Sequence, residues 1–208
     1  MLESDEPSVS EGSISDGRLV HGKRLPSRGE NFEAYSQLGA LLGRTCVHGD
    51  VREVVLDAYD RMAKARPEVT FTYGEASWCS GGGELAPHHT HQNGLSVDFM
   101  VPVVGEDGRP TSFPAWPWTK FGYGVDFDVK GTRAGYGIDF DALASHLLAL
   151  DRAAKNHGLT IRRVIFAPNL RPALFRADGG GEVRERIDFM EGRAWVEHDE
   201  HYHVDFSL

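Results

Sequence analysis

The sequence predicts an α+β protein in which a small central antiparallel sheet is flanked by helices and long loops. Two segments, residues 50–65 and 139–158, have apolar side chains at helical spacing. Several shorter segments have the alternating or β-branched pattern of strands. The two kinds of segment follow one another irregularly, which favours α+β over a doubly wound α/β fold.

The length indicates one domain. The chain has 208 residues, 40% of them hydrophobic, which is enough to bury a sizeable core. Residues 1–16 are acidic and serine-rich, without the apolar run of a secretory signal. We therefore expect a flexible polar segment over 1–16 and a single domain over 17–208.

The first half of the chain contains one clear helix. Glycine, proline and serine punctuate residues 17–36, as in short extended pieces and turns. The helix follows at 50–65, with Asp50 as a possible N-cap and Pro67 after its end. Residues 69–74 then have the composition of a strand.

The second half contains the other long helix. Residues 94–103 have strand character, and 104–139 form a long Gly/Pro/aromatic region without helical spacing. The helix at 139–158 ends at a glycine. Three short elements complete the chain: a strand at 160–167, a short helix at 168–176 and a final strand at 201–208.

Charge excludes some classes of partner. Lysine and arginine total 22 against 31 acidic residues, so the net charge is −9. This is the wrong sign for a protein that binds nucleic acid or an anionic membrane. No apolar run approaches the roughly 20 residues of a membrane span. We expect no nucleic-acid partner and no membrane span.

The two cysteines do not form a metal-binding motif. Neither Cys46 nor Cys79 has the CxxC or Cys/His spacing of a zinc finger. A disulfide in an oxidising compartment and two free buried thiols are both compatible with the sequence.

Histidines are concentrated in two distant stretches, HHTHQNGLSVDF at 88–99 and EHDEHYHVDFSL at 197–208. Successive side chains of a strand face opposite ways, so each stretch is apolar on one face and ionisable on the other. If the two strands lie near each other in an antiparallel sheet, Asp98, His201 and His203 converge. His91 can then reach the same point from the preceding loop.

This set of side chains fits catalytic zinc. Such an ion takes three imidazole or carboxylate ligands and keeps one position for water. His91, Asp98 and His203 fit the three places, which leaves His201 as a base. A base with an ordinary imidazole pKa would make activity rise with pH through roughly 6 to 7. The plainer alternative for Asp98 is a structural ion pair with an arginine.

Other side chains have less specific interpretations. The aromatic region is either a packed surface loop or a cleft wall, and we expect Trp116, Trp118 and Tyr123 to line the cleft. The histidines outside the two stretches are expected at the surface or at helix ends: His21, His48, His146 and His157.

The motifs resemble those of a known group of enzymes. His91-x6-Asp98, followed far downstream by His201-x-His203, is similar to the motif pair of the lysostaphin, D-alanyl-D-alanine peptidase and hedgehog group of zinc metallopeptidases. The stretches GGGELAPHHTHQNGLSVDF and WVEHDEHYHVDF resemble one branch more closely, the penicillin-insensitive murein endopeptidases. SDGRLVHGKRLP and VIFAPNLRPALF suit the same family, so the resemblance covers roughly residues 14–208.

The resemblance implies a site and a reaction. Zinc would be held by the three residues named above, with His201 as catalytic base and with His88 and His198 as further catalytic histidines. Either of the last two, when protonated, would stabilise an oxyanion. The implied reaction is hydrolysis of peptide cross-links in peptidoglycan, chiefly the D-alanyl to meso-diaminopimelyl bond. The implied partner is the peptide stem, and the implied location is periplasmic or secreted.

Three other functions are compatible with the same motifs. A D-alanyl-D-alanine carboxypeptidase or dipeptidase would need a cationic pocket, for which Arg133, Arg171 and Arg193 are candidates. A secreted antibacterial effector or a phage lysin would use the same chemistry. A hedgehog-like module would bind zinc without catalysis, and the candidate base His201 argues against it.

Overall fold

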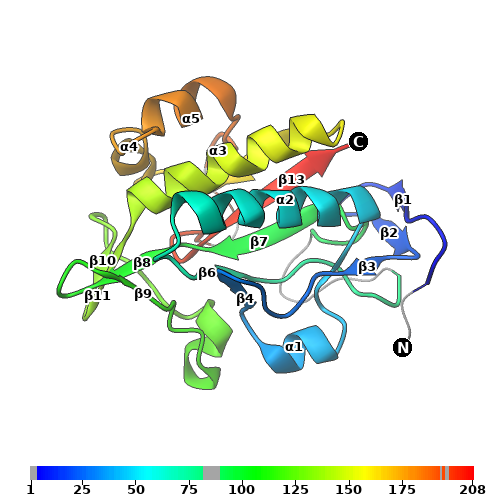
Figure 1. Ribbon diagram of the computed structural model, residues 1–208, viewed down its shortest axis with the longest axis horizontal. Coiled ribbons are helices and arrows are strands. Elements are labelled where there is room, and N and C mark those ends of the chain that lie inside the picture. The colour runs from blue at the N-terminus through cyan, green and yellow to red at the C-terminus, as the bar shows by residue number, and fades with distance from the viewer. Residues whose placement is uncertain (1–3, 82–89, 193, 195–196) are drawn as a thin grey trace.

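The computed structural model describes residues 4–81, 90–192, 194 and 197–208. Helices and strands are both well represented, and the strands form small, mainly antiparallel sheets (Figure 1). The α+β prediction is confirmed.

The central sheet has the strand order β12-β13-β7-β6-β4. These strands are β4 (Phe32–Ala34), β6 (Phe71–Tyr73), β7 (Ser96–Met100), β12 (Thr160–Ile165) and β13 (His201–Ser207). Neighbours from β12 to β6 are antiparallel, as expected, whereas β4 runs parallel to β6 and makes that edge of the sheet mixed. The two strands that carry the ionisable motifs, β7 and β13, are direct neighbours in the middle.

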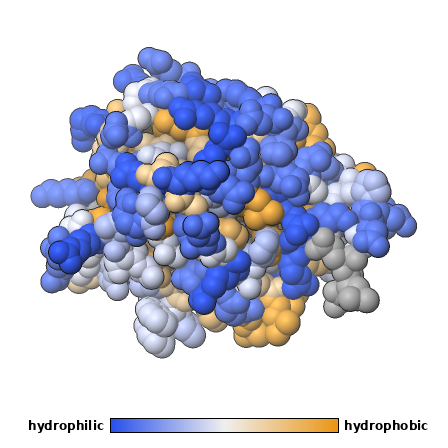
Figure 2. Space-filling view, in the orientation of Figure 1, coloured by the Kyte–Doolittle hydropathy of each residue, from blue (hydrophilic) through white to orange (hydrophobic). Residues whose placement is uncertain are grey.

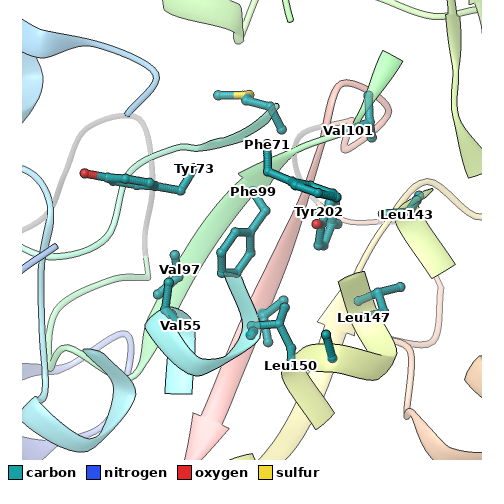
Figure 3. Close-up of a cluster of buried hydrophobic side chains, with 14 of the residues drawn as sticks. Val55, Phe71, Tyr73, Val97, Phe99, Val101, Leu143, Leu147, Leu150 and Tyr202 are labelled. Atoms are coloured by element: carbon teal, nitrogen blue, oxygen red, sulfur yellow. The ribbon is translucent and has the colours of Figure 1, made fainter. Parts of the chain in front are cut away.

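Two long helices cover one face of this sheet. Helices α2 (Gly49–Ala65) and α3 (Phe140–Asn156) lie along the same side of β7 and β13 (Figure 1). The apolar side chains of the two strands point toward the helices, as a close-up shows for one cluster (Figure 3). The labelled members are Val55, Phe71, Tyr73, Val97, Phe99, Val101, Leu143, Leu147, Leu150 and Tyr202. The alternate, ionisable side chains therefore face away from the long helices.

Both long helices begin and end for recognisable reasons. The first is capped by His48, whose Nδ1 accepts a hydrogen bond from the Asp50 amide, so Asp50 lies in the first turn and is not the cap. The carboxylate of Asp139 caps the second helix by accepting from the Ala142 amide. Gly158 follows the second helix with a φ of 77°, a left-handed conformation that glycine adopts without strain.

Smaller elements surround this core. A second sheet has the order β10-β11-β8-β9, from β8 (Val103–Gly105), β9 (Pro110–Thr111), β10 (Thr132–Arg133) and β11 (Tyr136–Ile138). Strands β1 (Val9–Gly12) and β2 (Gly17–Val20) form a hairpin, and β3 (Lys23–Arg24) pairs with β5 (Cys46–Val47) in a separate two-stranded antiparallel sheet. The short helices are α1 (Gln37–Leu41), the 3₁₀ helix η1 (Pro117–Gly122), α4 (Arg171–Leu174) and α5 (Gly180–Arg186).

Part of the polar lead over 1–16 forms a hairpin with the residues that follow it. Strand β1 pairs with β2 around a turn in which Gly12 has a φ of 69°. The Ser10 hydroxyl donates a hydrogen bond to the Asn93 carbonyl at 2.6 Å, and Ile14 is buried. The hairpin is held by backbone pairing, and its sequence has almost no hydrophobic pattern that would predict it. The flexibility expected over 1–16 stays a prediction.

The surface is mostly polar on the face shown in Figure 2. Its exposed large apolar residues include three leucines on and just after α1: Leu38, Leu41 and Leu42. Within the described part of the chain, no helix combines the length and apolarity needed to cross a membrane.

His146 is buried in the core, contrary to the expectation of a surface or helix-end position. Its ring stacks on Tyr59 and Phe71, with centroid distances of 5.1 and 5.0 Å, and its Nδ1 contacts the Tyr202 hydroxyl. Burial lowers the pKa of His146 to about 3. The helical spacing of α3 had placed this residue among leucines, which is the signal that identifies it as a core histidine.

We expect His146 to make the fold sensitive to acid. Its folded-state pKa lies below the unfolded value of about 6.5, so the unfolded chain binds the proton more readily. The contribution of the neutral His146 ring to the free energy of unfolding is therefore complete above about pH 6.5. Below that pH it falls by roughly 1.4 kcal/mol per pH unit. His146→Phe should lower stability at pH 7.5, because Tyr202 loses its partner, but flatten the decline toward pH 4.5. Urea unfolding of both proteins across this range, with exposed His157→Phe as control, measures the difference; parallel declines would contradict this role.

Cys46 and Cys79 form a disulfide, which resolves the two alternatives left by the sequence. The bond links β5 to the turn before the first histidine stretch, across a sequence separation of 33 residues. Closing a loop of this length stabilises the fold by about 4 kcal/mol in the chain-entropy account.

The Cys46→Ser/Cys79→Ser variant should therefore unfold about 3 to 4 kcal/mol more easily than the oxidised protein. Reduced wild-type protein should match the variant. Chemical denaturation with and without reductant measures both differences. Equal unfolding free energies in all three samples would show that the bond contributes nothing to stability.

Candidate metal centre

Two neighbouring strands bring Asp98 and His203 together. Strands β7 and β13 are antiparallel, and their register places Asp98 directly opposite His203 and places Met100 opposite His201. Both strands have their apolar side chains against the long helices, so these ionisable groups share the other face. The predicted convergence of the two distant motifs is present in the fold.

His91 completes a group of three ligand atoms. His203 Nδ1 lies 2.8 Å from Asp98 Oδ1, and His91 Nε2 lies 3.2 Å from the same oxygen. The three ligand atoms are all within 4.8 Å of one another, and the three residues are buried. His91 itself has a φ of 68°, a left-handed conformation that costs a non-glycine residue about 1 kcal/mol or more. This group could hold a metal ion.

In the described part of the chain, the ion-pair partners of Asp98 are histidines and not an arginine, as a ligand group requires. Burial alone would raise the pKa of Asp98, but the neighbouring His91, His201 and His203 hold it well below its usual range. Against the effect of burial, Asp205 and Asp98 raise the pKa of His203 to about 9. Positive charge is thus favoured at the point where the side chains meet.

Outer contacts orient both imidazole ligands. His91 Nδ1 lies 3.3 Å from the Ser96 carbonyl, and His203 Nε2 lies 2.7 Å from Asp205 Oδ1. Asp205 also accepts hydrogen bonds from Ser96 Oγ at 2.6 Å and from Arg163 Nε at 2.7 Å. Metal-binding histidines characteristically donate their second N–H to such a carbonyl or carboxylate. His91 Nε2 and His203 Nδ1 are therefore the nitrogens left for a metal.

His201 lies beside the ligand group. Its Nε2 is 3.9 Å from Asp98 Oδ2, and its Nδ1 is 3.0 Å from the buried carboxylate of Glu200. Burial lowers the pKa of His201 to about 4 and raises that of Glu200 to about 7. The expectation of an ordinary imidazole pKa was wrong, because the side chain is withdrawn from water.

Of the other two predicted catalytic histidines, His198 lies in the described part of the chain and His88 does not. The His198 ring lies 4.5 Å from that of His201 and 6.5 Å from that of His203, between ring centroids. It therefore belongs to the same cluster, although it is not one of the three convergent ligands. His88 lies outside the described residues.

Tyr123 connects the aromatic region to the centre. Its hydroxyl donates to Asp98 Oδ2 at 2.9 Å and accepts from the Glu75 amide at 2.9 Å, and its ring lies 5.1 Å from that of His201. The other two aromatic residues expected to line the cleft are exposed, Trp116 by 54% and Trp118 by 78%, and stack on each other.

Sequence reasoning missed the supporting residues of the centre. It assigned no role to Ser96 or Asp205, although both lie on the ionisable faces of their strands, and this period-two position was the available signal. Tyr123 was expected in the cleft wall, but its contact with Asp98 was not predicted, because it approaches from far along the chain. Glu200 was missed because it is adjacent to His201 but outside the strand's alternation.

Gly74 leaves room for this arrangement. A Cβ atom there would lie 2.6 Å from the Tyr123 hydroxyl oxygen and 2.9 Å from Asp98 Cβ, closer than real contacts allow. Gly74→Ala should displace one or both side chains and weaken metal binding by about 10- to 100-fold, the usual effect of disturbing a ligand's support. Competition with a chelator of known affinity measures this. Gly181→Ala, whose Cβ would meet nothing within 4 Å, is the matched control, and unchanged affinity in Gly74→Ala would show that the site tolerates the displacement.

A cavity of about 560 Å³ adjoins the centre at His198. Its walls are mainly apolar, and its polar lining includes one arginine. The lining residues are Phe127, Val129, Ile165, Phe166, Ala167, Pro168, Asn169, Arg171, Gly192, Ala194, Glu197, His198 and Asp199. Space of this size beside a candidate metal centre can admit part of a substrate.

Comparison with known proteins adds no family assignment, since neither a family model nor a curated protein matches the chain. The residues of the site are therefore the evidence for its chemistry. A carboxylate and two oriented imidazoles converge in a buried place, with a third imidazole beside them that is not required as a ligand.

Proposed function

We propose that the protein is a zinc-dependent murein endopeptidase that hydrolyses D-alanyl to meso-diaminopimelyl cross-links of peptidoglycan. The observation that carries the proposal is the buried convergence of His91, Asp98 and His203 with His201 beside them. Two imidazoles and one carboxylate are a ligand set that catalytic zinc uses, with a further position left for water. We infer the substrate from the resemblance of the sequence motifs to those of the penicillin-insensitive murein endopeptidases.

The residues around the centre suit hydrolysis. Zinc, when bound, supplies a Lewis acid that polarises a carbonyl group and makes a water molecule more acidic. His201 faces the ligands through Nε2 while Glu200 holds its Nδ1, so Nε2 is the atom that accepts a proton from the attacking water. We propose that His198, whose ring lies 4.5 Å from that of His201, donates a hydrogen bond to the oxyanion.

The disulfide supports a location outside the cytoplasm. Disulfides such as Cys46–Cys79 form and persist in oxidising compartments, which include the bacterial periplasm and the extracellular space. Peptidoglycan is reached from these compartments. We therefore propose a periplasmic or secreted protein.

Digestion of purified cross-linked muropeptides tests the proposal. The zinc-loaded protein should convert dimers to monomers, and mass spectrometry should show addition of one water at the D-alanyl to meso-diaminopimelyl bond. Chelator should stop the reaction, and zinc should restore it. Intact dimers after prolonged incubation with zinc-loaded protein would reject the function.

A further inference from the structure

Arg171 is held in a fixed orientation at the cavity beside His198. Its Nε and Nη2 donate hydrogen bonds to the Phe166 carbonyl at 2.9 and 2.8 Å. Its guanidinium carbon lies over the Phe189 ring, 5.3 Å from the centroid. Both contacts use the main chain or a neutral ring, and they leave the guanidinium with further N–H groups. A guanidinium held in this way loses little conformational freedom when it binds a ligand.

Arg171 is a half-buried cation that lines this cavity. Burial lowers the pKa of Arg171. Among the residues that the structure describes, no acidic side chain forms an ion pair with it. A partly buried cation that has lost hydration without gaining an opposite charge favours an anionic ligand, and a planar guanidinium suits a carboxylate. Of the three arginines proposed for such a pocket, Arg133 is exposed on β10, and Arg193 lies outside the described residues.

The cavity connects Arg171 to the metal centre. Arg171 and His198 both line it, and the His198 ring lies 4.5 Å from that of the candidate base His201. The apolar part of the lining, which includes Phe127 and Ile165, suits the aliphatic part of an amino acid. A ligand bound here can present a carboxylate to Arg171 and a reacting bond to the centre.

The chemistry of a peptide bond identifies which residue carries that carboxylate. On the acyl side of the scissile bond, the α-carboxyl group is consumed in the bond itself. A free carboxylate close to the bond therefore belongs to the residue that supplies the nitrogen. Glu197 and Asp199, which also line the cavity, suit the ammonium group that cleavage leaves on the same carbon.

We infer that the cavity binds the nitrogen-side residue of the substrate and that Arg171 recognises a free carboxylate on the carbon bonded to the scissile nitrogen. This inference rests on the proposed peptidase function. The substrate class includes cross-links to meso-diaminopimelate and D-alanyl-D-alanine ends. It disfavours cross-links to lysine, whose ε-carbon has no carboxylate.

Two product-like peptides that cannot be cleaved at this bond test the inference. The tripeptide stem ending in meso-diaminopimelate and the matched stem ending in lysine differ only in the carboxylate. Calorimetric titration of the zinc-loaded protein should show about 10- to 100-fold tighter binding of the first, the range for a charge-assisted contact. Arg171→Gln should bring the two dissociation constants together, Arg171→Lys should keep part of the difference, and exposed Arg133→Gln should keep all of it.

The ratio of the two constants is the decisive quantity, because a partial loss of folded protein changes both titrations alike. Equal binding of the two stems by the wild type, no binding of either at millimolar concentration, or an unchanged ratio in Arg171→Gln would overturn the inference. Free D-alanine, titrated beside the stems, separates the two sources: tighter binding of the diaminopimelate stem assigns the carboxylate to a cross-link, and the reverse order assigns it to a terminal D-alanine. Failure to hydrolyse muropeptides, with the ratio still lost in Arg171→Gln, would reject the endopeptidase while the carboxylate site stands.

Discussion

Asp98→Ala is expected to remove nearly all zinc from the protein and to abolish peptide hydrolysis. The carboxylate is the shared point of the centre: His91 Nε2 and His203 Nδ1 both lie within 3.2 Å of Asp98 Oδ1. Its loss deletes one of three ligands and leaves two imidazoles with no anion between them. Zinc should fall from about one ion per chain to a small fraction of that, as measured by inductively coupled plasma mass spectrometry on gel-filtered protein.

The control for this change is another buried carboxylate. Asp151 lies in α3, where it is paired with Lys155 and Arg186 and is not part of the ligand group. Asp151→Ala should lower stability but keep the zinc. Full zinc content in Asp98→Ala would show that the ligands have been assigned wrongly.

His201→Ala is expected to lose about 10²- to 10⁴-fold in turnover, the usual contribution of a general base, while it keeps the zinc. The reason is positional. His201 Nε2 is 3.9 Å from Asp98 Oδ2, and the ligand set is complete without it. Zinc content and muropeptide turnover should be measured on one preparation, so that incomplete loading cannot be mistaken for lost catalysis.

Other outcomes of this variant have distinct meanings. If His201→Ala loses the metal, base and ligand have been exchanged within the HxH motif. If it keeps both metal and full activity, another group is the base, and His198 is the nearest candidate because its ring lies 4.5 Å from that of His201. Zinc binding without any turnover in the wild type would indicate a hedgehog-like binding module.

Much of the centre was predictable because it lies on two strands. Alternation along the chain separates the apolar from the ionisable face, and both faces of β7 and β13 were assigned correctly for Asp98 and His203. The two long helices were predictable for a similar reason, since each has one continuous apolar stripe with end signals close to its observed bounds.

What the sequence could not show depends on contacts between distant segments. Tyr123 meets Asp98 across 25 positions of irregular chain, and Arg163 meets Asp205 across 42 positions. Neither local spacing nor periodicity encodes such pairs. The short helices α1 and α5 were also missed, because five and seven residues give too few turns for a helical pattern. The ionisation of His201 was misjudged because burial is a property of the folded chain.

The central claim is that zinc binds where His91, Asp98 and His203 converge. Anomalous diffraction from crystals of the zinc-loaded protein, recorded on both sides of the zinc absorption edge, tests it most directly. The account predicts one strong peak, about 2.0 to 2.2 Å from His91 Nε2, a carboxylate oxygen of Asp98 and His203 Nδ1. A peak bound by other side chains, or no peak at this group in protein that contains zinc, would contradict it.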